Sequence, residues 1–130
     1  MENIAFGGIE LAWDPDSRLA TLGFRKMTKG TGKDATRLVE AMSRWIGPDP
    51  KPFGLLGDGG KLAGVDAEYR SVWARFLREH RNQCSIAFFD MGVVVRIAAE
   101  MFRIGTGVRM RAFAKEDDAR AWLREMGLNA

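Results

Sequence analysis

The sequence predicts an α/β fold in which strands and helices alternate to build a sheet covered by helices. After Pro52, short apolar runs alternate three times with longer amphipathic stretches. This order is typical of parallel strands joined by crossover helices. Before Pro52, two strand-like segments flank a short polar turn, the pattern of a β-hairpin. We therefore expect a mixed sheet with an N-terminal β-hairpin, βα repeats and about four helices.

The predicted N-terminal hairpin consists of residues 4–13 and 18–27. In the first strand Ile9, Leu11 and Trp13 alternate with more polar or smaller residues and share one face. The Asp-Pro-Asp-Ser sequence between the strands is a turn signal, because proline presets φ and the flanking side chains bond to nearby backbone. The two strands are therefore expected to pair with each other.

Apolar spacing of three and four residues predicts the helices, and short apolar runs predict the remaining strands. The second helix carries Tyr69, Trp73, Phe76 and Leu77 on its core face, and Asp66 is its expected N-cap. The predicted helices are residues 33–46, 66–81, 91–104 and 116–126, and the predicted strands are residues 53–56, 85–90 and 108–114.

Length and composition indicate one domain over residues 1–130, with enough apolar residues (46%) for a core. The single cysteine, Cys84, begins an apolar run and is read as a small core residue. With no possible internal disulfide, the chain suits a reducing compartment. No signal-peptide pattern and no bilayer-length apolar segment are evident, so we expect a cytoplasmic protein without a transmembrane segment.

The closing segment carries a resemblance to a known family. The strand Val-Arg-Met-Arg-Ala-Phe (residues 108–113) precedes Lys-Glu-Asp-Asp-Ala-Arg-Ala-Trp-Leu (residues 115–123). This pair resembles the final strand and the acid-capped helix of STAS / SpoIIAA-like domains, and the order of elements over nearly the whole chain resembles them too. These are bacterial regulatory modules related to the sporulation anti-anti-sigma factor. The resemblance implies a SpoIIAA-like fold and an anti-sigma-factor-antagonist-like role in protein–protein interaction.

One departure from the family concerns its switch. Classical members carry a phosphorylated serine in an Asp-Ser pair at a helix start, where this chain has Asp66-Ala67. Ser71 lies a turn further into the helix, where a phosphate would lose much of the stabilisation that a helix N-terminus provides. We therefore expect a divergent member that lacks the phosphoacceptor and is not switched by phosphorylation at that site.

No catalytic or metal-binding constellation stands out. His80 is the only histidine, no zinc spacing is present, and the Gly-Thr-Gly-Lys sequence of residues 30–33 lacks the other positions of a phosphate-binding loop. The mild net charge of +3, with aromatic residues at core-like positions, does not predict nucleic-acid binding. The sequence thus predicts a protein that is not an enzyme and has no metal and no cofactor.

The glycine-rich segment at residues 57–61 follows a predicted strand. In open α/β sheets ligands bind beyond the carboxyl ends of the strands. In the resembled family this loop and the following helix start form the partner-recognition region. The resemblance therefore implies a partner-binding edge, with an ordinary surface loop as the alternative; its candidate residues are Asp58, Lys61, Asp66, Tyr69 and Arg70.

The predicted third helix is unusually apolar. Its polar residues form one narrow stripe, and apolar residues cover the rest of its circumference. Such a wide apolar face needs cover from the domain core, a second copy, a protein partner, an apolar ligand or a membrane surface. The candidate residues of this dimer or ligand face are Val93, Val94, Val95, Ala98, Met101 and Phe102.

These observations favour a non-catalytic regulatory or protein-interaction module that acts through a protein partner or self-association. The alternative is a carrier or sensor of an apolar or lipid-like small molecule. The alternative rests on the wide apolar helix and on the similarity of STAS-like folds to Sec14-type lipid-binding domains.

Overall fold

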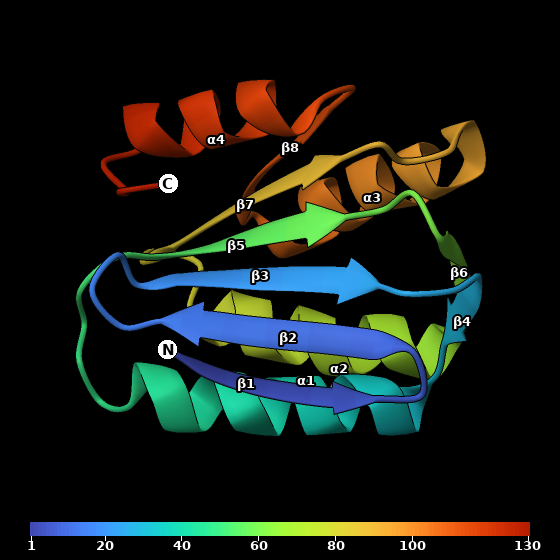
Figure 1. Ribbon diagram of the computed structural model, residues 1–130, viewed down its shortest axis with the longest axis horizontal. Coiled ribbons are helices and arrows are strands. Elements are labelled where there is room, and N and C mark those ends of the chain that lie inside the picture. Colours follow the sequence, from blue (N-terminus) through green and yellow to red (C-terminus); the bar gives the residue numbers. More distant parts are fainter.

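The computed structural model describes residues 1–130, with the exception of the side chain of Val94. Its main sheet has six strands in the order β1-β2-β3-β5-β7-β8 (Figure 1). The first three pair antiparallel, and β3, β5, β7 and β8 pair parallel, so the predicted mixed sheet is confirmed. The strands are β1 (Glu2–Phe6), β2 (Ile9–Asp14), β3 (Leu19–Phe24), β5 (Phe53–Asp58), β7 (Cys84–Phe89) and β8 (Arg109–Phe113).

The four predicted helices are confirmed, with shifts of one or two residues at most of their ends. The third begins two residues later than expected, because Gly92 has an extended backbone and serves as its N-cap. No helix in the described part of the chain has the length and apolar character needed to cross a bilayer. The helices are α1 (Gly32–Ile46), α2 (Ala67–Glu79), α3 (Val93–Thr106) and α4 (Glu116–Glu125).

The prediction of one strand over residues 4–13 was wrong. Gly7 and Gly8 have φ angles of 53° and 82° and reverse the chain, so that Phe6 faces Ile9 across an antiparallel pair. Glycine adopts positive φ without steric cost, which makes it the usual residue at such a turn. The sheet therefore gains an edge strand, β1, ahead of the predicted hairpin of β2 and β3.

A second sheet of two short parallel strands was not predicted. It consists of β4 (Thr28–Gly30) and β6 (Leu62–Val65), which lie at the end of the main sheet where β3 and β5 finish. Thr31 then caps α1: its Oγ1 accepts a hydrogen bond from the Asp34 amide, and the Asp34 carboxylate accepts one from the Thr31 amide. The glycine-rich segment at residues 30–33 therefore serves as the start of a helix.

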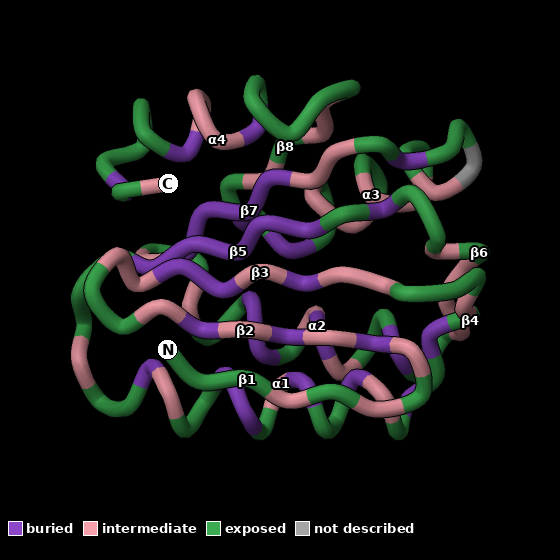
Figure 2. Tube along the Cα trace, in the orientation of Figure 1, coloured by how far each residue is buried: buried purple, intermediate pink, exposed green. Residues whose placement is uncertain are grey.

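The larger core lies between the sheet and helices α1 and α2. The two helices lie next to each other across one face of the sheet (Figure 1). Buried residues concentrate along β5, β7 and the inner sides of these helices (Figure 2). Cys84 is fully buried here, so its predicted core position is confirmed, and burial raises the pKa of its thiol. The central side chains are Leu11, Leu38, Met42, Phe53, Phe76 and Ile86.

Helix α4 packs on the opposite face of the sheet. A smaller core joins Leu56 and Ala87 of the sheet to Ala119 and Leu123 of α4, and Leu128 closes it. Strands β5 and β7 are therefore buried on both faces, as expected of parallel strands inside an α/β domain. Helix α3 lies on the same face of the sheet as α1 and α2, at the β7–β8 side and beside α2.

Gly30 allows a close approach between β4 and the ring of Tyr69. A Cβ atom at this position would lie 2.8 Å from two ring carbons of Tyr69. We expect Gly30→Ala to lower the free energy of unfolding by about 1–3 kcal/mol, because the ring must shift inside a packed wall. Urea unfolding monitored by circular dichroism measures the change.

Gly23 provides the control, because no heavy atom lies within 4 Å of a Cβ built there. Gly23→Ala should leave the stability unchanged or raise it slightly, since alanine restricts the unfolded chain more than glycine does. Equal stabilities of the two variants would contradict the proposed steric role of Gly30.

Candidate binding site between helices α2 and α3

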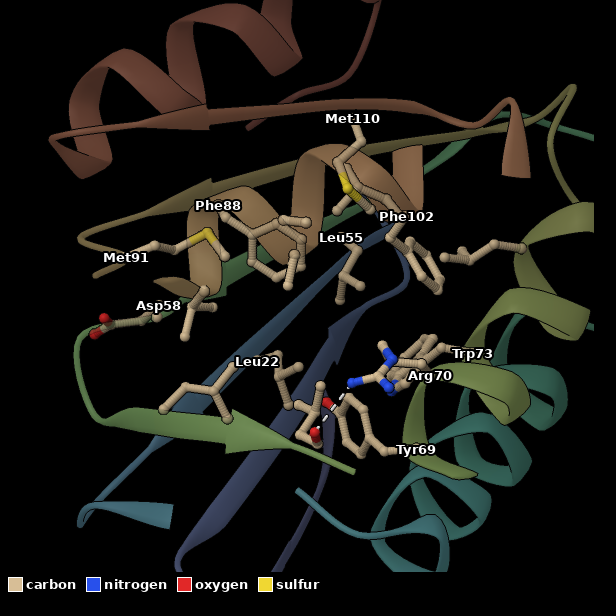
Figure 3. Close-up of a pocket in the computed structure, with 18 of the residues that line it drawn as sticks. Leu22, Leu55, Asp58, Tyr69, Arg70, Trp73, Phe88, Met91, Phe102 and Met110 are labelled. Atoms are coloured by element: carbon tan, nitrogen blue, oxygen red, sulfur yellow. Dashed lines mark hydrogen bonds between the residues drawn. The ribbon is translucent and has the colours of Figure 1, made fainter. Parts of the chain in front are cut away.

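A cavity of about 100 Å³ lies between α2, α3, β6 and the sheet (Figure 3). Its wall is largely aromatic and aliphatic, with contributions from every surrounding element. An engineered apolar cavity of about 150 Å³ holds benzene, so this smaller space limits a bound molecule to about one ring at most. Six of the side chains that line it are Leu55, Trp73, Phe88, Val95, Ala98 and Phe102.

Trp73 supplies a buried polar group in this apolar wall. The residue is 6% exposed, and its indole Nε1 has no hydrogen-bond partner in the described part of the chain. Its neighbour is Tyr69, whose ring centroid lies 6.4 Å away and whose hydroxyl pKa is lowered by the Trp73 side chain, against the larger effect of burial.

Tyr69 forms part of the same wall. The residue is 8% exposed, and its ring packs against Gly30. Burial raises the pKa of its hydroxyl to about 12, so the group stays protonated at physiological pH. The ring faces the protein interior in this structure, so little of its surface is open to a partner. The predicted role of Tyr69 in partner binding stays a prediction.

Asp66 and Arg70 hold the beginning of α2. The Asp66 carboxylate accepts a hydrogen bond of 2.7 Å from the Tyr69 amide, which confirms Asp66 as the N-cap. The Arg70 guanidinium is exposed and donates a hydrogen bond of 3.2 Å to the carbonyl of Val65, visible as the dashed line in Figure 3. Arg70 therefore lies at the cavity wall with one of its nitrogens already engaged.

Asp58 and Lys61 stabilise the turn between β5 and β6. An Asp58 carboxylate oxygen accepts a hydrogen bond of 3.0 Å from the Gly60 amide, and the Lys61 ammonium donates one of 3.1 Å to the Arg25 carbonyl. Both residues are exposed, and the Asp58 carboxylate points away from the middle of the cavity in Figure 3. The fold thus brings the five predicted edge residues to one end of the molecule, and their role in partner binding stays a prediction.

The residues predicted for a single apolar face of α3 divide between two sides of the helix. Val95, Ala98 and Phe102 line the cavity, while Val93 and Met101 are 74% and 70% exposed. The side chain of Val94 lies outside the described part of the structure. The predicted face therefore grouped residues of the inner, cavity-lining side of α3 with residues of its outer, exposed side, because both sides of this helix are apolar.

The outer surface includes two residues that were not among the predicted face. Ile97 and Ile104 are 59% and 70% exposed. In chain order, Val93, Ile97, Met101 and Ile104 are separated by four, four and three residues. This spacing places them in one row along the helix. We call these four residues the α3 stripe.

The ends of α3 are held mainly by backbone. Its N-cap, Gly92, has no side chain to accept a hydrogen bond, and the first turn contains no acidic residue. Asp90, just before it, has a φ of 58°, and Gly107 at the other end has a φ of 71°. The position of α3 therefore depends on its packing against α2 and the sheet more than on capping.

Comparison with known proteins finds relatives by structure only: no family model and no curated protein matches the sequence. An uncharacterised DUF3478-family protein from Shewanella loihica PV-4, described as having a SpoIIAA-like fold, superposes with a TM-score of 0.69. The two share 17% identity over 95% of this chain and 98% of that one. The fold of this chain is SpoIIAA-like. The fold implied by the sequence resemblance is therefore confirmed.

Two further structures share this SpoIIAA-like fold. Apo-SiaC from Pseudomonas aeruginosa has a TM-score of 0.61 at 12% identity, covering 88% of this chain and all of that one. A chain in the structure of the P. aeruginosa diguanylate cyclase SiaD in complex with its activator SiaC has a TM-score of 0.62 at 11% identity, with the same coverage. At these identities the similarity establishes the fold alone.

Tyr69 is the only tyrosine, so its ionisation can be followed by absorbance at 295 nm. We expect a midpoint near 12 in the folded protein, because burial raises its pKa to about 12, and one near 10 in urea. The unfolded chain loses this proton first, so stability should fall as pH rises from 10 to 12, by an amount of the order of 3 kcal/mol. Tyr69→Phe should remove this part of the loss, and a midpoint near 10 in the folded protein would refute the buried environment.

Asp66 gives a second test of the local structure. Asp66→Ala should lower the free energy of unfolding by about 0.5–2 kcal/mol, because the Tyr69 amide loses its capping acceptor. Asp66→Asn is the control and should retain most of the stability, since asparagine is an equally good N-cap. Chemical denaturation measures both variants; an alanine variant as stable as the asparagine variant would argue against capping.

Proposed function

We propose that residues 1–130 form a single non-catalytic regulatory domain that acts in the bacterial cytoplasm by binding another protein. The observation that carries this proposal is the α3 stripe, four large apolar side chains that are 59–74% exposed. Contiguous exposed apolar surface on a small protein is typical of an interaction site. The described part of the chain also contains no group of three residues suited to hold a metal ion.

The comparisons support a protein partner for a domain of this fold. SiaC, which has the same fold, is described as the activator of a diguanylate cyclase and was found in complex with it. That case gives an example of a SpoIIAA-like domain that works by association with an enzyme. We therefore favour a protein partner over a second copy of this chain or a membrane surface.

The charges beside the stripe define the partner's chemistry. Arg96 is exposed on α3, and Arg103 is partly exposed and bound to Glu100 of the same helix by a hydrogen bond of 3.0 Å. Interfaces combine an apolar centre with a polar rim. We expect the partner to present an apolar surface bordered by acidic residues that complement Arg96.

The edge formed by the β5–β6 turn and the beginning of α2 is a second contact region in this proposal. Asp58, Lys61 and Arg70 are exposed there and available for polar contacts. Asp66 and Tyr69 contribute by holding this edge, through the helix cap and the packed ring. By the sequence resemblance, Ala67 stands where STAS / SpoIIAA-like domains have their phosphoserine, so we propose regulation by association. Phosphate detected at residues 66–71 in protein from its native host would oppose this.

A second candidate function, a carrier or sensor of an apolar small molecule, is favoured by the cavity between α2 and α3. At about 100 Å³ the cavity fits a compact molecule of about one ring better than a long acyl chain. This candidate uses the inner side of α3, whereas the protein-binding function uses the outer side.

The partner can be identified and the stripe tested in one series of experiments. A photoreactive residue at position 101 should crosslink one partner in the native host, and that partner is then purified and mixed with this protein. Ile97→Lys should weaken binding about tenfold or more, because it places a charge in the apolar centre of the interface. Isothermal titration calorimetry measures the affinity.

Ser43→Lys is the matched control, because it adds the same charge at an exposed position of α1, away from the stripe. It should bind the partner as the wild type does. Equal affinities of the Ile97 and Ser43 variants would disprove the stripe as the interface. If light scattering shows a homodimer that Ile97→Lys dissociates, the stripe binds a second copy of this chain. If the protein binds lipid vesicles and no protein complex is found, the stripe binds a membrane surface. Either result would contradict a protein partner of another kind.

A further inference from the structure

Exposed arginines make the outer side of α2 basic. They are Arg70, Arg75 and Arg78 within the helix and Arg81 just after its end. None of these guanidinium groups forms an ion pair with a carboxylate in the described part of the chain, whereas four other arginines do. Arginine is enriched at protein interfaces, because its planar group is weakly hydrated and matches the geometry of a carboxylate. This surface is therefore suited to meet acidic groups.

The charges of α2 are divided between two of its sides. Arg70 and Leu77 line the cavity that α2 shares with α3, so this side of the helix is turned toward α3. Glu68 lies on the side toward α1, where a Cβ atom at Gly32 would overlap its side chain. Arg78 follows Arg70 by about two turns and lies on the α3 side. We call Arg70, Arg78 and Arg81 the arginine row.

The arginine row and the α3 stripe run along neighbouring helices. Helices α2 and α3 lie next to each other on one face of the sheet (Figure 1). Arg96 adds a further exposed positive charge on α3. The one carboxylate of α3, that of Glu100, already accepts a hydrogen bond from Arg103. This face of the molecule thus combines exposed apolar side chains with an excess of positive charge.

We propose that the α3 stripe and the arginine row together bind one acidic amphipathic helix of the partner protein. This inference rests on the proposed function and specifies the segment of the partner. The apolar side of the partner helix packs on the stripe, and its carboxylates pair with the arginine row. Arginine and carboxylate groups pair through two parallel hydrogen bonds, so the row also sets the orientation in which the helix docks.

The shape of the stripe favours a helix as the docked segment. Its four side chains follow one line over residues 93–104 of α3, a length of about 17 Å. A second helix presents a matching line of apolar side chains at spacings of three and four residues, and the two lines pack as ridges and grooves. A partner helix of about three turns covers the stripe, with its acidic flank over the arginine row.

Two peptides of about 14 residues test the charge of the docked helix. Both carry leucine at spacings of three and four residues, and the other positions are glutamate in one peptide and glutamine in the other. In titrations of the full chain followed by fluorescence anisotropy, the glutamate peptide should bind about fivefold more tightly or better, and salt should reduce this difference. Ile97→Asn should weaken both peptides, because it removes an apolar side chain from the stripe without adding charge.

Arg78→Glu tests the arginine row. It should weaken the glutamate peptide about fivefold or more and leave the glutamine peptide unchanged, because it replaces an attraction by a repulsion. Arg44→Glu is the matched control: Arg44 is exposed in the last turn of α1, as Arg78 is in the last turn of α2. Both variants have the same net charge, so a general attraction between protein and peptide affects them equally. Arg44→Glu should bind both peptides as Arg78 protein does.

The other outcomes separate this proposal from the proposed function. Equal affinities of the two peptides, or equal effects of Arg78→Glu and Arg44→Glu, would overturn the acidic helix, and weakening by Ile97→Asn would still support the stripe as an interface. Failure of both peptides to bind would overturn the docked helix, while crosslinking from position 101 tests the proposed function separately. Binding to phosphatidylglycerol vesicles in place of the peptides would identify a membrane surface as the occupant and overturn both.

Discussion

The structure depends on the burial of strands β5 and β7 on both faces of the sheet. Parallel strands require crossover connections, and each crossover places a helix on a face. Helices α1 and α2 cover the centre of one face, and α4 covers part of the other. Helix α3 lies at the β7–β8 side, where the fold requires only its inner side to be apolar. The apolar character of its outer side is therefore not explained by folding, which is why we assign that side to binding.

Much of this arrangement could be predicted from the sequence because alternation and helical spacing follow burial directly. Ile9, Leu11 and Trp13 were placed on one face of a strand, and all three are buried. The reversal at Gly7 and Gly8 was missed because the residues on either side continue a strand-like pattern across it. The short strands β4 and β6 were missed because a pair of three or four residues depends on a partner distant in sequence, which local periodicity does not report.

The candidate site was predictable only in part. The sequence showed that α3 is apolar around most of its circumference, but periodicity cannot distinguish the inner side, with Ala98 and Phe102, from the outer side, with Val93 and Met101. Trp73 was placed correctly on the core face of α2. That the same side chain also lines a cavity depends on where β6, α3 and the sheet lie, and these positions are set by the tertiary packing.

The two proposed sites lie on opposite sides of α3, so a shift of this helix is the means by which binding at one would affect the other. A molecule in the cavity contacts the inner side of the helix, and a partner contacts the stripe on its outer side, so each biases the position of the same element. If one ligand favours the helix position that the other also favours, each raises the affinity for the other by the same factor. Helix α3 thus has one apolar side that lines the cavity and another that is exposed, and under the two proposals it is the element that both binding functions share.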